Sequence, residues 1–265
     1  MRFDNKVALV TGAGSGIGRA TALGFGQRGA AVAVSDVNAE NAAQTAADIA
    51  AAGGNAIAII ADMAKLADIE RMIAETMRAF GRIDALHNNA FGLPASLQQS
   101  RVSRFADLNE EVWAYTIQIG LTAVMQTTRR VLPIMRAQRG GAIVNTASIS
   151  GQFADYGIAA YNVMKAGVIN LTNVVAVEYG PDNIRCNCVC PGPIDTPLLQ
   201  KSLVIPGFAE ATRAAVPMQR LGQPEEMANV VLFLASDLAS YVNGAAVVAD
   251  GGLTAKTGIP TRFRD

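Results

Sequence analysis

The sequence predicts an α/β fold, in which a doubly wound parallel sheet is flanked by helices in a single domain. Short, almost continuous apolar runs alternate with helical patterns, and such runs are typical of parallel strands buried on both faces. The chain has 265 residues, which suits one compact domain. No internal repeat or low-complexity linker interrupts the alternation, so one domain is expected over residues 1–265. The right-handed crossover rule then gives the doubly wound arrangement.

Each element follows from a run and the turn signal beside it. Apolar runs predict strands at residues 6–12, 30–36, 55–62, 83–90, 141–148, 183–192 and 245–252. Helical patterns between them cover 17–29, 38–54, 66–81, 110–138 and about 157–179. The Ala-rich second helix ends on Gly53 and Gly54, because glycine favours helix ends. The third helix places Ile69, Met72 and Ile73 on one face.

Composition and charge exclude several classes of function. The chain carries 22 basic and 22 acidic residues and no basic run, so nucleic acid is not an expected partner. The N-terminus lacks the long apolar segment of a signal peptide, and no apolar run approaches the ~18 residues of a membrane span. The three cysteines cannot all pair within one chain. A cytoplasmic, reduced protein with no membrane partner is therefore expected.

The segment TGAGSGIG joins the first predicted strand to the first predicted helix. Gly12 permits a sharp turn, Gly16 lets the backbone approach a pyrophosphate, and Gly18 lets helix and strand pack closely. The N-terminus of the helix offers free N–H groups and a positive dipole end to phosphates. The flanking strand and helix favour a dinucleotide cradle over a merely structural turn. Ser15 and Ile17 belong to the same predicted cofactor-binding set.

Asp36, at the end of the second strand, indicates which cofactor is bound. It lies 24 residues beyond Gly12 and can accept hydrogen bonds from a ribose 2′-OH. A carboxylate there repels the 2′-phosphate of NADP, and its neighbours Ser35, Val37 and Asn38 supply no cation. Arg19 is the nearest cation, but we expect it to face solvent from the helix. The predicted cofactor is therefore NAD.

The segment YNVMK places Tyr161 and Lys165 four residues apart, on one face of a helix. A phenol with a pKa near ~10 is a poor base at neutral pH. An ammonium group beside it, with the charge of oxidised nicotinamide, lowers that pKa, and the tyrosine then exchanges a proton with a carbinol or carbonyl oxygen. Ser148, at the end of the preceding strand, can hydrogen-bond the same oxygen.

Over nearly its whole length the chain resembles the short-chain dehydrogenase/reductase family. The matching pieces, in order, are TGAGSGIG, Asp36, the DM pair at 62–63, NNA at 88–90, Ser148, YNVMK, PGPIDTP and ADGG. The resemblance implies a Rossmann-type fold, hydride transfer with NAD or NADP, and a homotetramer. It implies that Tyr161 is the general acid/base and Ser148 positions the substrate oxygen. Lys165 would bind the nicotinamide ribose and lower the pKa of the tyrosine.

The resemblance also implies further cofactor contacts. The DM pair would lie near the adenine, and the NNA segment along the cofactor. In PGPIDTP, backbone groups around Ile194 would hold the carboxamide, and Thr196 would reach the carboxamide or the pyrophosphate. The predicted contacts outside the glycine-rich loop and Asp36 are Asp62, Met63, Asn89, Ala90, Tyr161, Lys165, Pro191, Gly192, Ile194 and Thr196.

Two positions depart from the family pattern. Phe91 stands where NNAG has glycine, so its side chain either shapes the pocket or turns away. Gly120 falls where the family has an Asn that helps hold a water linking Lys165 to solvent. Three outcomes are open: the proton relay survives through backbone and water, another group substitutes, or catalysis is weakened. Gln118, two residues away on a helix, is expected to point to the opposite face.

The cysteines and the single histidine have simpler interpretations. Cys186, Cys188 and Cys190 alternate on one strand and so point to the same face. This arrangement does not converge on a tetrahedral metal, and no histidine lies near in sequence. Core packing is expected, with a reactive thiol at Cys190 as the alternative. His87 suits general-base chemistry in isolation, but beside Tyr161 it is expected to pack at a strand end. No metal is predicted.

The sequence thus predicts an NAD-dependent oxidoreductase that interconverts a secondary alcohol and a ketone. Residues 91–108 and 197–217 are irregular and follow strand ends, where ligands bind in such sheets. The apolar content of 197–217 predicts a flexible lid over a hydrophobic cyclic, steroidal or aliphatic substrate. Two alternatives are a 3-oxoacyl thioester reductase and a cofactor-binding protein with weakened catalysis. The tail from residue 253 is expected either to fray or to strap a neighbouring subunit.

Overall fold

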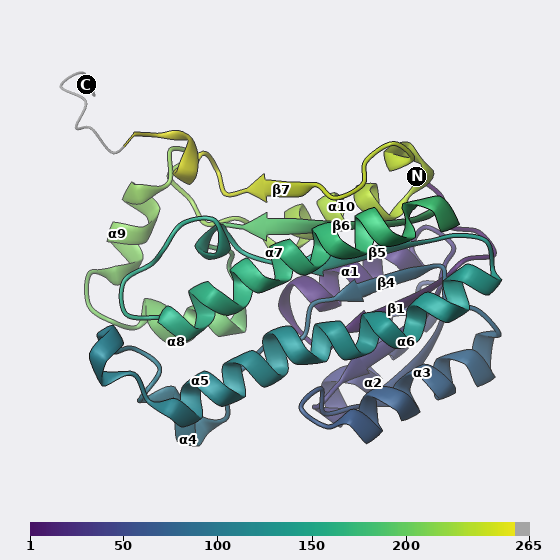
Figure 1. Ribbon diagram of the computed structural model, residues 1–265, viewed down its shortest axis with the longest axis horizontal. Coiled ribbons are helices and arrows are strands. Elements are labelled where there is room, and N and C mark those ends of the chain that lie inside the picture. Colours follow the sequence, from purple (N-terminus) through teal and green to yellow (C-terminus); the bar gives the residue numbers. More distant parts are fainter. Residues whose placement is uncertain (258–265) are drawn as a thin grey trace.

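The computed structural model describes residues 1–257 as a seven-stranded sheet between two layers of helices (Figure 1). The strands are β1 Val7–Thr11, β2 Ala31–Asp36, β3 Asn55–Ile60, β4 Ala85–Asn88, β5 Gly141–Thr146, β6 Ile184–Pro191 and β7 Ala246–Ala249. They lie in the order β3-β2-β1-β4-β5-β6-β7, and every neighbouring pair is parallel. The predicted fold class is therefore confirmed. The end of the tail, 258–265, lies outside the described residues.

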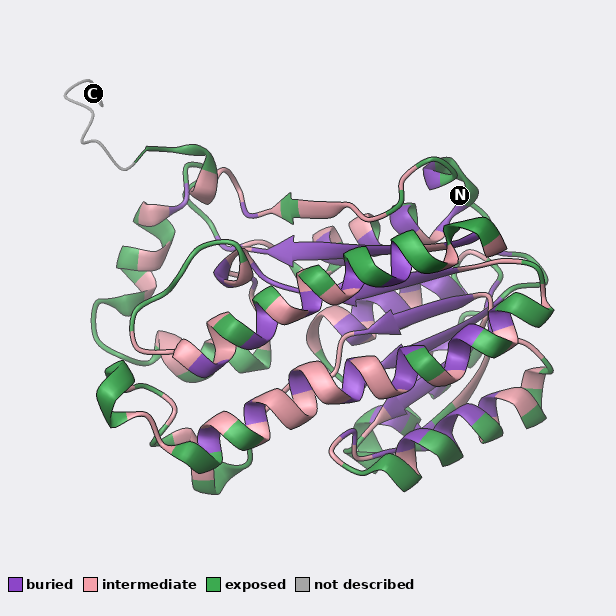
Figure 2. Cartoon of the chain, viewed as in Figure 1, coloured by how far each residue is buried: buried purple, intermediate pink, exposed green. Residues whose placement is uncertain are grey.

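Helices cover both faces of the sheet, whose strands other than the edge strands β3 and β7 are largely buried (Figure 2). One layer contains α1 Gly16–Gly26, α2 Ala39–Ala51 and α10 Pro224–Ala235, and the other α3 Leu66–Phe80, α5 Glu110–Ile117, α6 Ala123–Ala137 and α7 Ala159–Tyr179. Successive residues of a strand point to opposite faces of the sheet and belong to different hydrophobic clusters. Leu9 packs with residues of α3 and α6, whereas Val10 packs with residues of α1. Apolar strands without polar alternation are thus explained by burial on both sides.

The helix α10 is missing from the sequence prediction, although its signals are present. Pro224 occupies the first turn, and Glu226 accepts a hydrogen bond from the backbone N–H of Gln223 at 2.8 Å, as in a helix start. Leu232 of this helix packs tightly against α1, where a Cβ at Gly24 would lie 2.7 Å from Leu232 Cδ1. Small residues on α1 therefore allow close packing of α10.

Two predicted irregular segments contain short helices. Residues 91–108 include α4 Ala95–Gln98, and residues 197–217 include α8 Pro197–Leu203 and α9 Phe208–Ala215. They lie at the end of the sheet toward which the strand arrows point (Figure 1). The helix predicted over 110–138 is interrupted by a π-helical turn, Gln118–Thr122, between α5 and α6. None of the helices within residues 1–257 is long and apolar enough to span a membrane.

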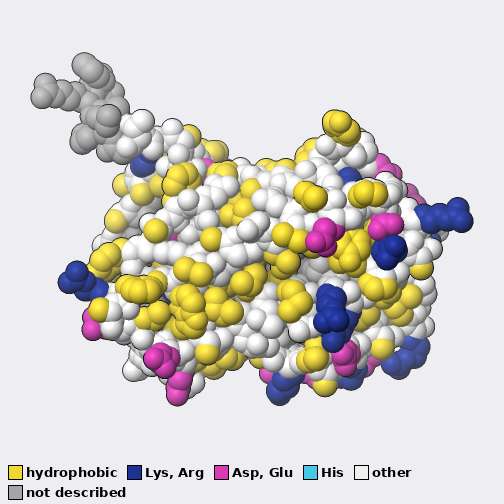
Figure 3. Space-filling model, in the orientation of Figure 1, with side chains coloured by type: hydrophobic (Ala, Val, Ile, Leu, Met, Phe, Trp, Pro, Cys, Tyr) yellow, Lys and Arg dark blue, Asp and Glu magenta, His cyan; other side chains and the backbone are white. Residues whose placement is uncertain are grey.

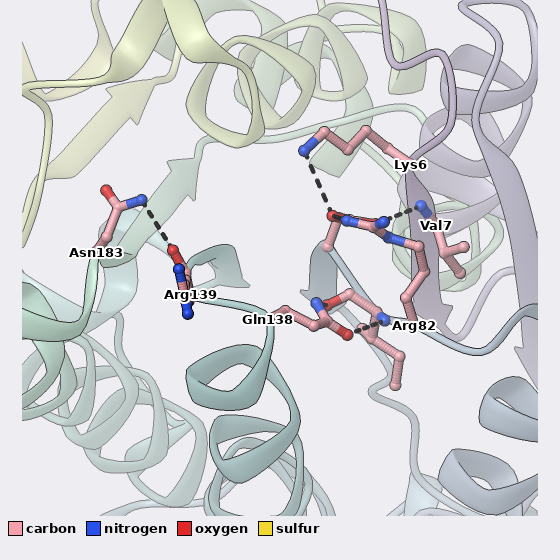
Figure 4. A network of polar contacts seen from close by, with 8 residues as sticks. Lys6, Val7, Arg82, Gln138, Arg139 and Asn183 are labelled. Carbon is pink, nitrogen blue, oxygen red and sulfur yellow. Dashed lines mark hydrogen bonds and ion pairs between the residues drawn. The ribbon is translucent and has the colours of Figure 1, made fainter.

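A polar network fixes the opposite, amino ends of the strands (Figure 4). The Asp84 carboxylate accepts hydrogen bonds from the Val7 N–H at 2.9 Å and from the Arg82 guanidinium at 2.6 and 2.7 Å. The Gln138 side chain exchanges two hydrogen bonds with the backbone of Ile83. Because these contacts join β1, the entry to β4 and the end of α6, they keep the neighbouring strands in register.

We predict that Asp84→Ala lowers the free energy of unfolding by about 1–3 kcal/mol, because it leaves the buried Val7 N–H without its acceptor. Asp4 is the matched control. It is paired with Arg2 at the same sequence spacing, but its side chain is 54% exposed against 12% for Asp84, so Asp4→Ala should change stability little. Urea titration of both variants checks this, and equal losses would contradict it.

The contribution of Asp84 should also depend on pH. Burial raises its pKa, but hydrogen bonds from Arg82 and Val7 outweigh burial and hold the pKa below the usual value. A lowered folded-state pKa means that the stabilisation is present above the unfolded-state pKa of about 3.9. It is lost as pH falls through the folded-state value. The stability gap between wild type and Asp84→Asn should therefore narrow below about pH 4.

Candidate active site

The glycine-rich loop between β1 and α1 has no room for side chains at the positions singled out in the sequence. Gly12 and Gly16 have φ values of +63° and +52°, a conformation that favours glycine. A Cβ at Gly18 would lie 2.1 Å from the Gly12 carbonyl oxygen. Ser15, at the N-cap of α1, is exposed. The loop therefore leaves the N-terminus of α1 open as a backbone cradle that fits a phosphate group.

Asp36 faces this loop from the end of β2. Its Oδ2 accepts a hydrogen bond from the Gly14 N–H at 2.8 Å, and its Oδ1 accepts one from the Asn38 N–H at 2.9 Å. A Cβ at Gly14 would lie 2.9 Å from Oδ2, so glycine permits this approach. Arg19, expected to face solvent, has a side chain that is 40% exposed and pairs with Asp48 at 2.7 Å. No ion pair neutralises Asp36 within the described part of the chain.

Segments far apart in sequence close around the cradle. Thr196, at the N-cap of α8, has its Cγ2 only 3.2 Å from where a Cβ of Gly16 would stand. On the other side, Asn89 Nδ2 donates to the carbonyl oxygens of Thr11 and Gly12, each at 3.2 Å. The structure therefore brings three predicted cofactor segments together, and Asn89 also fixes the turn at Gly12.

Four more of the predicted cofactor residues lie along the same edge of the sheet. Met63 and Ala90 line one cavity with Thr11 and Asn89. Ile17 packs against a buried cluster that contains Ile194.

Two further segments complete the predicted set. Asp62 follows β3, accepts a hydrogen bond from the Ala64 N–H at 3.0 Å and pairs with Lys65 at 3.4 Å. Pro191 ends β6, and Gly192 is so close to Asp250 that a Cβ would lie 2.7 Å from the Asp250 Cβ.

Ser148, Tyr161 and Lys165 meet beyond the end of β5. Ser148 follows this strand and lies beside the Tyr161 phenol. Lys165 lies one turn after Tyr161 on α7, with its Nζ 5.6 Å from the phenol ring centroid. The Nζ donates to the Thr146 carbonyl at 2.6 Å. Ser148 and Lys165 are 7% and 4% exposed, so the three groups form one largely buried site.

Burial controls the ionisation of this site. It raises the pKa of Tyr161 to about 12, although the hydrogen bond with Ser148 acts to lower it and the Asp155 carboxylate raises it further. Burial lowers the pKa of Lys165 to about 8, while neighbouring thiols act to raise it. The predicted lowering of the tyrosine pKa by Lys165 together with the charge of the oxidised cofactor stays a prediction.

Phe91 shapes the site and does not turn away from it. Its ring packs edge-to-face on Tyr161, with centroids 5.2 Å apart and planes at 63°. The Lys165 Nζ lies 5.5 Å from the Phe91 ring centroid, within the range of a cation–π contact. The residue that replaces the family glycine therefore covers the side chains of Tyr161 and Lys165 with an aromatic ring.

Gly120 is explained by Met164, which precedes Lys165 in YNVMK. Gly120 lies buried in the π-helical turn, and a Cβ there would lie 2.5 Å from Met164 Sδ and 2.7 Å from its Cγ. The fully buried Met164 side chain therefore fills the space that an asparagine would need. Gln118 donates to the Ala64 carbonyl at 3.3 Å, and so does not act in place of the asparagine. Met164 was not singled out from the sequence, because a contact between two helices has no local signal.

The histidine and the cysteines pack as expected. His87 is buried, its Nε2 contacts Thr146 Oγ1 at 2.8 Å, and burial with the nearby Lys165 lowers its pKa to about 3, so the ring is neutral. Cys186, Cys188 and Cys190 are free and fully buried. No group of residues that could hold a metal ion exists in residues 1–257. Core packing of the cysteines is therefore confirmed.

Comparison with known proteins decides the family. A family model described as enoyl-(acyl carrier protein) reductase matches residues 12–254. Cyclohexanol dehydrogenase of Acinetobacter sp. (strain SE19) is 43% identical over 256 residues, which cover 96% of this chain and 97% of that protein. The chain belongs to the short-chain dehydrogenase/reductase family. It is thus an oxidoreductase of a family that uses a nicotinamide cofactor.

Other members of the short-chain dehydrogenase/reductase family are almost as similar. The 3-oxoacyl-(acyl-carrier-protein) reductase of Thermotoga maritima is 39% identical over 254 residues, covering 96% of this chain and 99% of that protein. The crystal structure of levodione reductase superposes with a TM-score of 0.90 at 36% identity, covering 96% of this chain and 99% of that one. The similarity covers 96% of this chain in both cases.

The packing of Gly120 against Met164 can be tested by a double-mutant cycle. We predict that Gly120→Asn destabilises the protein by about 1–3 kcal/mol, because the added side chain overpacks the core. In the Met164→Ala background the same change should cost at least about 1 kcal/mol less. Gly92, whose Cβ would meet no atom within 4 Å, supplies the control Gly92→Asn. Strictly additive effects in urea titration would contradict the explanation.

Proposed function

We propose that this protein is an NAD-dependent oxidoreductase that interconverts a hydrophobic secondary alcohol and the corresponding ketone. The observation that carries the proposal is the meeting of Ser148, Tyr161 and Lys165 at the strand ends beside the glycine-rich cradle. A substrate oxygen placed between Ser148 and Tyr161 lies within hydrogen-bond reach of both side chains. The cofactor takes up or delivers the hydride, while the side chains handle the proton.

Each polar side chain has one task in this proposal. Ser148 orients the substrate oxygen, and Tyr161 gives or takes the proton. Lys165, fixed by the Thr146 carbonyl, holds the nicotinamide ribose and offers positive charge to the phenolate. Because burial raises the tyrosine pKa to about 12, the phenolate also needs the positive charge of the oxidised cofactor. Proton abstraction is therefore coupled to the presence of NAD.

The preference for NAD rests on Asp36. Its carboxylate stands at the mouth of the cradle, held by two backbone N–H groups and without an ion-pair partner in the described residues. It is suited to accept from ribose hydroxyls and repels a 2′-phosphate. Arg19, the first cation after the glycine-rich loop, is engaged by Asp48 and so does not compensate for the repulsion.

The hydrophobic substrate is supported by the segments around the site. The predicted lid and the loops that face it expose large apolar side chains. On the lid these are Val204, Ile205 and Phe208, and on the facing loops Val102, Phe105, Phe153 and Tyr156. Arg101 donates to Ser202 Oγ at 2.6 Å, which ties residues 91–108 to the lid. The relatives that act on cyclohexanol and levodione agree with a cyclic substrate.

A homotetramer is part of the proposal. The face that carries α5, α6 and α7 displays hydrophobic side chains (Figure 3). On α7, Val163, Val174 and Val177 are 48%, 45% and 79% exposed. An apolar helix face of this kind is suited to pack against a second copy.

Turnover tests the proposed reaction. With NAD and a panel of cyclic, steroidal and aliphatic secondary alcohols, wild type should form NADH, and Tyr161→Phe should lose about 10²- to 10⁴-fold in kcat. Tyr179→Phe, on the distal end of the same helix, is the matched control and should keep wild-type activity. A 3-hydroxyacyl thioester belongs in the panel, because turnover of that substrate alone would support the thioester reductase. Tight NAD binding with no turnover would support a cofactor-binding protein.

The cofactor preference is tested separately. We expect Asp36→Asn to lower kcat/KM for NAD relative to NADP by about 10- to 100-fold, since a hydrogen bond to a charged group contributes about 1.5–3 kcal/mol. Initial rates with both cofactors and the best alcohol give this ratio. An unchanged ratio of kcat/KM for the two cofactors would show that Asp36 does not bind the ribose hydroxyls.

A further inference from the structure

A chain of hydrogen bonds leads from the catalytic serine to the protein surface. Ser148 Oγ and Ser150 Oγ are 3.1 Å apart, and Ser150 Oγ donates to Asp155 Oδ2 in a short hydrogen bond. Both serines are less than 10% exposed, whereas Asp155 is exposed. The three side chains therefore connect the buried site with solvent without a gap.

The hydroxyl protons of this chain point outward. A carboxylate only accepts hydrogen bonds, and a serine has a single hydroxyl proton. Because Ser150 gives its proton to Asp155, its oxygen accepts from Ser148. With its proton given to Ser150, the Ser148 oxygen keeps a lone pair free and lies beside the Tyr161 phenol. The donors then run from Ser148 to Asp155, the direction needed to remove a proton from the site.

The backbone holds this route in place. The Ser150 N–H donates to Ser148 Oγ at 3.1 Å, at the start of a 3₁₀ turn, Ile149–Gly151. The Asn162 side chain donates to the Asp155 carbonyl at 2.8 Å. Asn162 follows Tyr161 directly, so the residue beside the catalytic tyrosine anchors the loop that carries the carboxylate.

The opposite side of the site has no comparable route. Lys165 Nζ donates to the Thr146 carbonyl, and within residues 1–257 no other hydrogen bond of this group is found. Gly120 has no side chain, and Met164 fills the adjoining space. Phe91 covers the amino group from another side. A proton that leaves through Lys165 would therefore meet apolar side chains.

We propose that Ser148, Ser150 and Asp155 conduct the proton released by alcohol oxidation to solvent, in place of the route through the family asparagine. The inference rests on the proposed function. The substrate hydroxyl gives its proton to the Tyr161 phenolate as its hydride goes to NAD. The phenol then passes a proton to Ser148 Oγ while Ser148 passes its own to Ser150 and Ser150 passes its own to Asp155. Asp155 releases that proton to water, and Tyr161 is again a phenolate.

The electrostatics agree with this connection. The charged groups that face Tyr161 within the described residues are Lys165 on its own helix and Asp155 on the preceding loop. The Asp155 carboxylate acts to raise the pKa of the phenol, after the larger effect of burial. Carboxylate and phenol therefore influence each other, although one is exposed and the other is enclosed.

The test compares Asp155→Asn and Ser150→Ala with wild type in NAD-linked alcohol oxidation. Both variants should lose about tenfold or more in kcat, with little change in KM. In Asp155→Asn, small buffers such as formate or imidazole should restore the rate with rising concentration, while wild type should not respond. Asp155→Glu should keep most of the activity. Asp107→Asn, an exposed carboxylate on the facing segment, is the matched control and should behave as wild type.

A second measurement does not need a substrate. Tyrosinate formation is followed by ultraviolet absorbance as pH rises, and subtracting the titration of Tyr161→Phe isolates the signal of Tyr161. The pKa of Tyr161 obtained in this way should be lower in Asp155→Asn than in wild type. Wild-type kcat without buffer response in Asp155→Asn would overturn the route, and so would an unchanged tyrosine pKa. Absence of turnover in wild type itself would instead count against the proposed function, so the two failures are distinguishable.

Discussion

The buried ammonium group of Lys165 is the constraint around which the site is organised. A charged group that is 4% exposed must find partners in the protein, because its desolvation is costly. It has the Thr146 carbonyl and two aromatic faces, Phe91 and Tyr161. These partners come from β5, the end of β4 and α7, so the sheet and the helix must meet at this point. Burial still lowers the lysine pKa to about 8.

Thr146 connects this cation to the cofactor cradle. Its carbonyl accepts from Lys165, while its hydroxyl donates to Asn89 Oδ1 at 3.2 Å and contacts His87 Nε2. The Asn89 amide then holds the carbonyl of Gly12. Hydrogen bonds therefore run from the catalytic helix across the ends of two strands to the glycine-rich loop. The neutral histidine takes part by packing beside the threonine and not by accepting protons.

Much of this could be predicted from the sequence, because the determining signals are local. Gly12 and Gly16 need a positive φ, and Tyr161 with Lys165 needs only the spacing of one helical turn. The start of helix α10 is also encoded locally, by Gln223 and Pro224. The pairing of Gly120 with Met164 could not be predicted, since it depends on how two helices pack. The degree of burial of Tyr161, which raises its pKa to about 12, is a tertiary property and could not be predicted from the spacing to Lys165.

Gly120, Met164 and Phe91 act together on the same side of the site. Gly120 lacks the polar side chain of the family asparagine, and Met164 fills the space that this side chain would take. Phe91 places an aromatic ring over Lys165 where the family has glycine. All three changes make the surroundings of Lys165 drier, and a drier lysine is a weaker carrier of protons to solvent. A site that remains catalytic under these conditions needs a polar exit elsewhere. The serine side, where hydroxyls and an exposed carboxylate follow the strand end, is where this fold supplies one.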